Sequence, residues 1–306
     1  MMRRFLIHFL LSFILFVSCS KDDEVFVPVD RTIIIYMAAD NDLSEDAWDN
    51  IREIQDGYRE SGANLLVFID SAEDAPHILK IGRGSSTRVK TYPEFNSADA
   101  AQMERVLNDI VEMYPAASYG LVLWSHGTSW LPAGSHLKSF GEDNGRQMNI
   151  TALASSLPIR FDFILMDACL MGSVEVAYEL RNKTDFIIAS PTEIIYTGFP
   201  YVQIISELLR AKPDFDKVAE EYINFYNQLS GAYRSATISL LAAMRRERRR
   251  ESITSKRGYF SKNGCKPKQC EIKKKIPSSK TKSRAVNVTE FRIIGMKARG
   301  RVLNCR

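Results

Sequence analysis

The sequence has few of the residues that build disulfide frameworks or zinc sites. It contains five cysteines in 306 residues, and one of them, Cys169, lies in the central part of the chain. A disulfide framework is therefore excluded. No two cysteines have CxxC spacing, and no histidine lies near the three C-terminal cysteines. We therefore expect no metal centre built on cysteine and histidine.

Several signatures of other enzyme classes are also absent. The chain has no GxSxG motif, which argues against a serine hydrolase. The segment Gly82-Arg83-Gly84-Ser85-Ser86 lacks the lysine and the following helix of a phosphate-binding loop. No internal repeat is visible. The chain therefore also lacks the glycine fingerprint that would support a nucleotide-binding α/β protein.

Charge divides the chain into two unlike parts. Residues 1–243 carry 20 Lys and Arg against 33 Asp and Glu, whereas residues 244–306 carry 21 against 4. The first part has the composition of an acidic globular protein. The second is basic and has no sustained apolar period, which predicts a disordered or aberrant tail. A basic tail can bind nucleic acid, but the chain is predicted to be exported, so we expect no nucleic-acid partner.

The N-terminus reads as an export signal. Arg3 and Arg4 precede the 13-residue apolar stretch Phe5–Val17, which is too short to span a bilayer as a helix. Residues 16–19 resemble a bacterial lipobox, so Cys19 is the expected lipidation site. The acidic run that follows resembles the surface-export signal of Bacteroidetes lipoproteins. These features predict a lipid-anchored outer-membrane or cell-surface lipoprotein, and a plain secretory signal to the periplasm or medium is the alternative.

Strands and helices alternate between these terminal segments. The expected strands are short apolar runs and the expected helices have apolar residues at helical spacing. This alternation predicts an α/β domain with a mainly parallel sheet and helices on both faces, over residues 32–243. Residues 1–19 are then the signal peptide, residues 20–31 a tether and residues 244–306 the tail. The strands are expected at residues 32–38, 65–69, 119–124, 161–166, 185–190 and 236–240.

Two of the expected strands end in reactive side chains. The run Tyr119–Trp124 is followed by His126, and the run Phe161–Met166 is followed by Cys169. If these strands are neighbours in a parallel sheet, their ends lie about 5 Å apart at the edge where such sheets bind ligands. The two side chains would then form a nucleophile and a proton-transfer partner. The helix expected after Cys169 is predicted to favour its thiolate through the partial positive charge at the helix N-terminus.

Four segments of the chain form a recognisable series: Tyr36–Leu43, Trp124–Gly127, Asp167–Met171 and Gly198–Tyr201. In this order they resemble the clostripain family of cysteine peptidases. The family has a caspase-like, three-layer α/β/α fold, so the resemblance implies this fold for about residues 32–240.

The resemblance also implies a role for each matched residue. Cys169 would be the nucleophile and His126 the general acid/base. The backbone N–H groups of Gly127 and Cys169 would hold the oxyanion. Asp167 would line the substrate pocket and select polypeptides with Arg or Lys at the cleaved bond. From the sequence alone, Asp167 could instead cap the next helix.

Further expectations concern maturation and cofactors. Family members often cut themselves between the histidine and cysteine strands, where Lys138 and Arg146 are the possible sites. Some members need calcium, but Asp40-Asn41-Asp42 does not fit an EF-hand, so no cofactor is certain and calcium stays possible. The resulting prediction is an endopeptidase that cuts after Arg or Lys. The alternative is a catalytically inactive binding module on the same fold.

Overall fold

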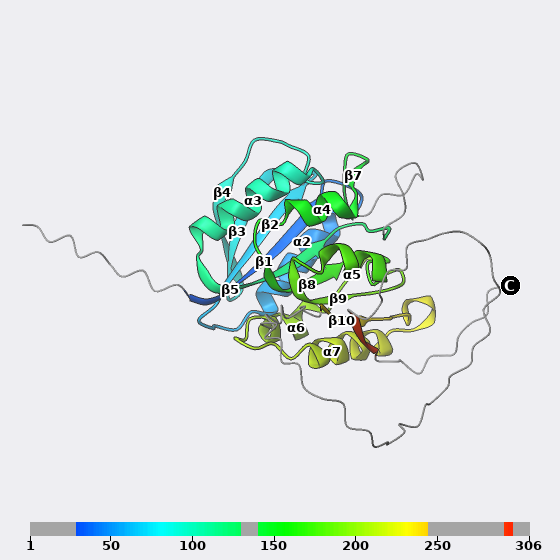
Figure 1. Cartoon of the computed structure of the whole chain (residues 1–306). Helices are drawn as coiled ribbons and strands as arrows, with labels where there is room; N and C mark the ends of the chain where they lie inside the picture. The colour runs from blue at the N-terminus through cyan, green and yellow to red at the C-terminus, as the bar shows by residue number, and fades with distance from the viewer. Residues whose placement is uncertain (1–28, 130–139, 244–290, 296–306) are drawn as a thin grey trace, which may run out of the picture.

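The centre of the molecule is a single large β-sheet. The computed structural model describes residues 29–129, 140–243 and 291–295, the last segment by its backbone alone. Within these residues a nine-stranded sheet has the order β11-β10-β9-β8-β5-β1-β2-β3-β4 (Figure 1). Its strands are β1 (Val29–Ala39), β2 (Asn64–Ser71), β3 (Asp74–Gly82), β4 (Ser85–Thr91), β5 (Ala116–Trp124), β8 (Phe161–Asp167), β9 (Thr184–Ala189), β10 (Ser239–Ala243) and β11 (Phe291–Gly295).

Five adjacent strands, β2, β1, β5, β8 and β9, are parallel to one another. The strands β3 and β10 pair antiparallel at either side of them. The middle strand β1 carries the run Ile33-Ile34-Ile35, whose three side chains are 0% exposed although they point alternately to opposite faces. A strand that is apolar on both faces is stable only with cover on each side. The predicted mainly parallel sheet is confirmed.

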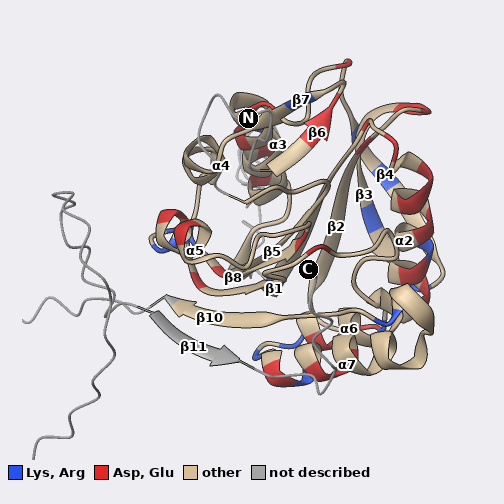
Figure 2. Cartoon of the chain, turned by 90° about the vertical axis from the view of Figure 1, so that its right-hand side faces the viewer, with Lys and Arg blue, Asp and Glu red and all other residues tan. Residues whose placement is uncertain are grey.

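Helices cover both faces of the sheet. The helices α3 (Ala100–Met113), α4 (Ile150–Ser156) and α5 (Val174–Leu180) bury apolar side chains in one core cluster. The helices α2 (Ser44–Gly57), α6 (Tyr201–Leu208) and α7 (Phe215–Gln228) bury theirs in a second cluster on the opposite face (Figure 2). These two cores give the three-layer α/β/α architecture that the alternating pattern predicts.

Some elements were not expected from the sequence. The stretch after the histidine strand contains the hairpin β6 (Phe140–Asp143) and β7 (Arg146–Met148), followed by α4. The last core strand begins at Ser239, three residues later than expected. In addition, Phe291–Gly295 of the basic tail forms β11, which pairs with β10 at the edge of the sheet. The domain limits given above remain predictions, and this strand shows that part of the tail joins the sheet.

Candidate active site

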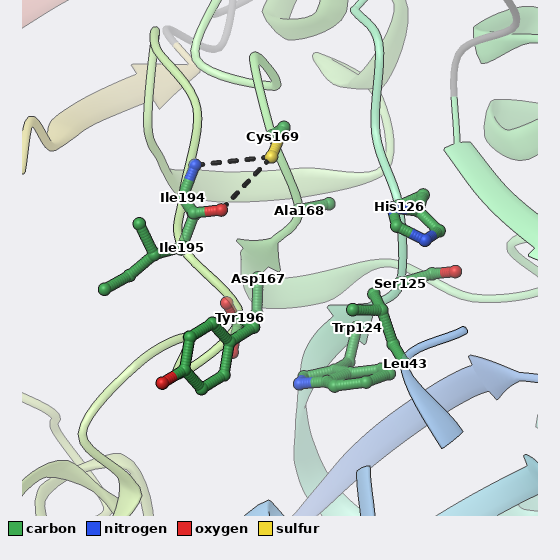
Figure 3. A pocket seen from close by; sticks show the side chains of 11 residues that line it. Leu43, Trp124, Ser125, His126, Asp167, Ala168, Cys169, Ile194, Ile195 and Tyr196 are labelled. Carbon is green, nitrogen blue, oxygen red and sulfur yellow. Dashed lines mark hydrogen bonds between the residues drawn. The ribbon is translucent and has the colours of Figure 1, made fainter. Parts of the chain in front are cut away.

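The expected meeting of the histidine and cysteine strands is confirmed. β5 and β8 are adjacent and parallel, and Trp124 pairs in register with Asp167. His126 and Cys169 each lie two residues beyond that pair, so the chain delivers them to the same level of the sheet edge. Both line a cavity of about 220 Å³ between the strand-end loops (Figure 3).

The loop that carries His126 is held against the sheet by backbone and hydroxyl contacts. The Ser125 hydroxyl donates to the carbonyl oxygen of Ala38 at 2.6 Å, and the carbonyl oxygen of His126 accepts from the N–H of Gly141 at 3.0 Å. The ring Nε2 lies 2.7 Å from Oδ1 of Asp42. The imidazole of His126 is therefore anchored through Nε2 while it lines the cavity.

Gly127 occupies a position that admits no side chain. A Cβ at this residue would lie 2.6 Å from the carbonyl oxygen and 3.2 Å from the backbone nitrogen of Cys169. The histidine loop and the cysteine loop therefore touch through their backbones, which requires glycine. No described residue accepts a hydrogen bond from the N–H of Gly127 or of Cys169. Neither of the two predicted oxyanion donors is therefore bonded to another described residue.

The thiol of Cys169 is half-buried and turned toward the loop after β9. Its Sγ donates to the carbonyl oxygen of Ile194 at 3.4 Å and accepts from the N–H of the same residue at 3.3 Å (Figure 3). The ring of His126 lies across the cavity, and no hydrogen bond joins it to the sulfur. The thiol and the imidazole therefore share one cavity while each is bonded to a different loop.

The expected effect of the helix N-terminus on the thiol was wrong. Helix α5 begins at Val174 with Ser173 as its N-cap, so four residues separate the thiol from the helix. The dipole effect fades within the first turn of a helix. Burial raises the pKa of Cys169 above its ordinary value, the contact with Ile194 lowers it in part, and nearby acidic groups add to the rise. Burial therefore favours the protonated thiol in the resting site.

Asp167 is the last residue of β8, and its carboxylate lies at the inner end of the cavity. The residue is 5% exposed. Its Oδ2 accepts from the N–H of Phe199 at 3.1 Å and from the hydroxyl of Tyr201 at 2.9 Å. Gly198, which has a φ of 61°, packs so closely that a Cβ would lie 2.6 Å from Oδ2. Burial raises the pKa of Asp167 to about 6, and the two hydrogen bonds oppose this rise.

The alternative role of Asp167 as a helix cap does not apply. The next helix is capped by the Ser173 hydroxyl, which accepts from the N–H of Val176. Both donors to the carboxylate are electrically neutral, and its Oδ1 accepts no hydrogen bond from a described residue. Asp167 is therefore a buried, half-satisfied carboxylate that faces a cavity.

The acidic loop after β1 does not converge on a cation. Asp40 accepts from the side-chain amide of Asn144, Asn41 holds its own loop, and Asp42 contacts His126. In the described part of the chain, no group of three or more His, Cys, Asp or Glu side chains could hold a metal ion. These residues therefore do not fit a calcium site.

The predicted lipidation site and the two possible self-cleavage sites lie in different parts of the chain. Cys19 and Lys138 lie outside the described residues. Arg146 is exposed and begins β7, directly after a tight turn in which Asn144 and Gly145 have φ values of 47° and 72°.

None of the helices in the described ranges is long and apolar enough to cross a membrane.

Sequence reasoning missed two contributors to the site. The sequence relates Asp42 only to a possible calcium site, because nothing local shows that its loop reaches His126. The segment Ile194-Ile195-Tyr196 forms one wall of the cavity and supplies the partner of the thiol. Its position directly after β9, at the same sheet edge, was the available signal.

The fold and the paired thiol and imidazole define a caspase-like α/β/α protein with a cysteine-peptidase type of site. Comparison with known proteins agrees with this class. The model of the clostripain family, peptidase family C11, matches residues 35–274. The chain belongs to this family.

Individual relatives are matched over part of their length. Clostripain from Hathewaya histolytica is 25% identical, over 58% of this chain and 42% of the relative. A secreted C11 cysteine protease from Bacteroides thetaiotaomicron, solved with an irreversible peptide inhibitor, is 34% identical with a TM-score of 0.63, over 70% of this chain and 66% of the other. An inactive zymogen C11 protease from Parabacteroides distasonis is 36% identical with a TM-score of 0.62, over 71% and 63%. The chain thus covers less than two thirds of each relative.

Proposed function

We propose that the chain is a cysteine endopeptidase that cleaves polypeptides after Arg or Lys. The observation that carries the proposal is the in-register placement of Cys169 and His126 beyond two adjacent parallel strands, beside a buried carboxylate in one cavity. Family membership agrees with this activity.

The reaction uses the two side chains in turn. The thiol of Cys169 leaves its contact with Ile194, passes its proton to His126, and the sulfur attacks the carbonyl carbon of the cleaved bond. The N–H groups of Gly127 and Cys169 stabilise the oxygen as it becomes negative. His126 then gives its proton to the departing amine, which leaves an acyl-enzyme. Water hydrolyses this thioester and returns the thiol.

Asp167 would account for the preference for Arg or Lys before the cleaved bond. Its Oδ2 is held by two neutral donors, so Oδ1 is left to meet a cation that enters the cavity. Ile194 and Ile195 line the same cavity and can pack along the aliphatic stem of an Arg or Lys side chain. A buried charge-assisted hydrogen bond is strong and specific for a positive group.

Maturation and location extend the proposal. Cleavage at Lys138 or Arg146 would separate the histidine and cysteine strands into two chains that stay joined through the sheet. Lipidation at Cys19 would anchor the protein at the outer membrane or cell surface. A related C11 protease is described as secreted and another as an inactive zymogen, which is consistent with export and with activation by cleavage.

A fluorogenic peptide series tests the activity. Substrates that differ only in Arg, Lys, citrulline or Ala before the cleaved bond are compared for the wild-type chain and Cys169→Ala. We expect fast turnover of the Arg and Lys substrates, much slower turnover of the citrulline and Ala substrates, and no turnover by the variant. Equal turnover by Cys169→Ala would refute the assignment. The inactive-module alternative predicts that an Arg-containing thiol-reactive probe labels Cys169 no faster than iodoacetamide does.

A further inference from the structure

An exposed acid at the rim of the cavity contacts the imidazole. Oδ1 of Asp42 lies 2.7 Å from Nε2 of His126, with 80% of the aspartate side chain and 32% of the histidine side chain exposed. The hydrogen bond from His126 is the largest cause that lowers the pKa of Asp42. The carboxylate is therefore ionised at neutral pH and can only accept a hydrogen bond.

The loop holds Asp42 in place although its side chain is exposed. The Asn41 Oδ1 accepts from the N–H of Leu43 at 2.9 Å, which closes a turn around Asp42. The Asn41 side-chain amide donates to the carbonyl oxygens of Ala38 at 3.1 Å and Glu142 at 2.7 Å. Two hydrogen bonds thus fix the residue just before Asp42 to the end of β1 and to the hairpin strand β6, and a third closes the turn. The carboxylate needs no burial to be directed at the ring.

This geometry determines which ring nitrogen can exchange protons. Because Asp42 only accepts, Nε2 must carry a hydrogen whenever this contact exists. Nδ1 is then the nitrogen that takes the proton from the thiol and later gives it to the departing amine. Without an acceptor on Nε2, the neutral ring would also populate the other tautomer, in which Nδ1 already carries a hydrogen and cannot act as a base.

We propose that Asp42 is the positioning residue of the active site, which holds His126 in the Nε2–H tautomer and directs Nδ1 to the reacting atoms. The proposal rests on the function proposed above and adds a third member to the pair of Cys169 and His126. It differs from an ordinary surface ion pair, which contributes little to stability and nothing to turnover. Asp42 acts through His126 and does not touch the substrate.

Kinetics of two variants at this position give the first test. Solvent weakens the hydrogen bond between His126 and the exposed Asp42, so we expect Asp42→Ala to lower kcat by only about tenfold, with KM within about twofold. Asp42→Asn keeps an acceptor but can also donate, so its kcat is expected to lie between those of the wild type and Asp42→Ala. Glu45→Gln removes an exposed negative charge three residues away and is the matched control, with kcat unchanged. An Asp42→Ala kcat within twofold of the wild type, or an equal loss in the control, would overturn the proposal.

The tautomer itself gives a test that does not depend on turnover. Two-bond ¹⁵N–¹H correlation spectra of the full chain are recorded in a Cys169→Ala background, and His126→Gln identifies the His126 signal among the four histidines. We expect the hydrogen on Nε2 with Asp42 present and a mixture of tautomers in Asp42→Ala. A hydrogen on Nδ1 in the presence of Asp42, or identical spectra, would refute the role. If the wild-type chain turns over no basic substrate, the proposed peptidase function fails while these spectra still decide the role of Asp42.

Discussion

Replacement of Asp167 by asparagine should make the protein more stable at neutral pH and much less active. The carboxylate is buried, and no described positive side chain contacts it. Asparagine has nearly the same shape. Its carbonyl oxygen can take the place of Oδ2 and accept from Phe199 and Tyr201, and its amide can take the place of Oδ1 at the cavity. The substitution therefore removes a charge and preserves the packing.

The gain in stability follows from proton linkage. Burial raises the pKa of Asp167 from 3.8 to about 6, and about two pKa units correspond to about 3 kcal/mol. Because the folded-state pKa is raised, the stabilising protonated form is fully present below about pH 4, and its contribution is lost as pH rises through about 6. Asparagine does not titrate. Relative to that of the wild type, the free energy of unfolding of Asp167→Asn should therefore rise by about 2–3 kcal/mol between pH 4 and pH 7.5.

The loss of activity follows from the missing charge. Removing one partner of a buried charge pair costs about 2–5 kcal/mol, which corresponds to at least about a thirtyfold lower kcat/KM for an Arg substrate. Citrulline is neutral and nearly isosteric with Arg. Asp167→Asn should therefore lower kcat/KM for a citrulline substrate by less than about threefold.

Urea unfolding at pH 4 and pH 7.5 and the two kcat/KM values are measured on the same preparations. A variant that is less stable at pH 7.5, or that loses both substrates equally, would show that Asp167 holds the structure and does not select the substrate.

Three further predictions follow from single positions. Gly127→Ala places a Cβ 2.6 Å from a backbone carbonyl oxygen of the cysteine loop, so kcat should fall by about 100-fold, whereas Gly62→Ala, which meets nothing within 4 Å, should leave it unchanged. Tyr201→Phe removes a hydrogen bond that lowers the pKa of Asp167, so the acidic limb of the kcat/KM profile for an Arg substrate should move to higher pH; an unmoved limb would contradict this assignment. Asp70 is fully buried, and burial together with the nearby carboxyl group of Asp143 raises its pKa to about 8. Thermal stability should therefore decline as pH rises from about 4 through about 8, and decline less in Asp70→Asn; parallel curves would argue against this.

The class of fold and the place of the site could be predicted because both depend on patterns that the sequence displays directly. Apolar runs that end in His126 and Cys169 predict buried parallel strands, and register then places the two side chains at one level. The spacing of Val174, Ala177 and Leu180 also predicted helix α5. These inferences need only the period of the apolar residues and the geometry of a sheet.

The side-chain contacts within the site could not be predicted in this way. Leu170 has a φ of 64°, a conformation that few non-glycine residues adopt, and it turns the chain away before α5 begins. The thiol therefore meets the backbone of Ile194 rather than a helix N-terminus. Similarly, the contact of Asp42 with His126 depends on how Asn41 folds its loop onto a hairpin about 100 residues away. Such contacts arise from tertiary structure and leave no periodic signal.

Asp167 is the position at which stability and function conflict most directly. A buried carboxylate costs stability unless a positive group neutralises it. Among the described residues, its hydrogen-bond donors are a backbone N–H and a tyrosine hydroxyl, both neutral. The closely packed Gly198 and the strand end hold the carboxylate at the cavity although an asparagine would fit the same space with less cost. Under the proposed specificity, a basic side chain of a substrate would supply the positive group that these residues lack. The same reasoning explains why the predicted loss of activity and gain in stability must appear together in one variant.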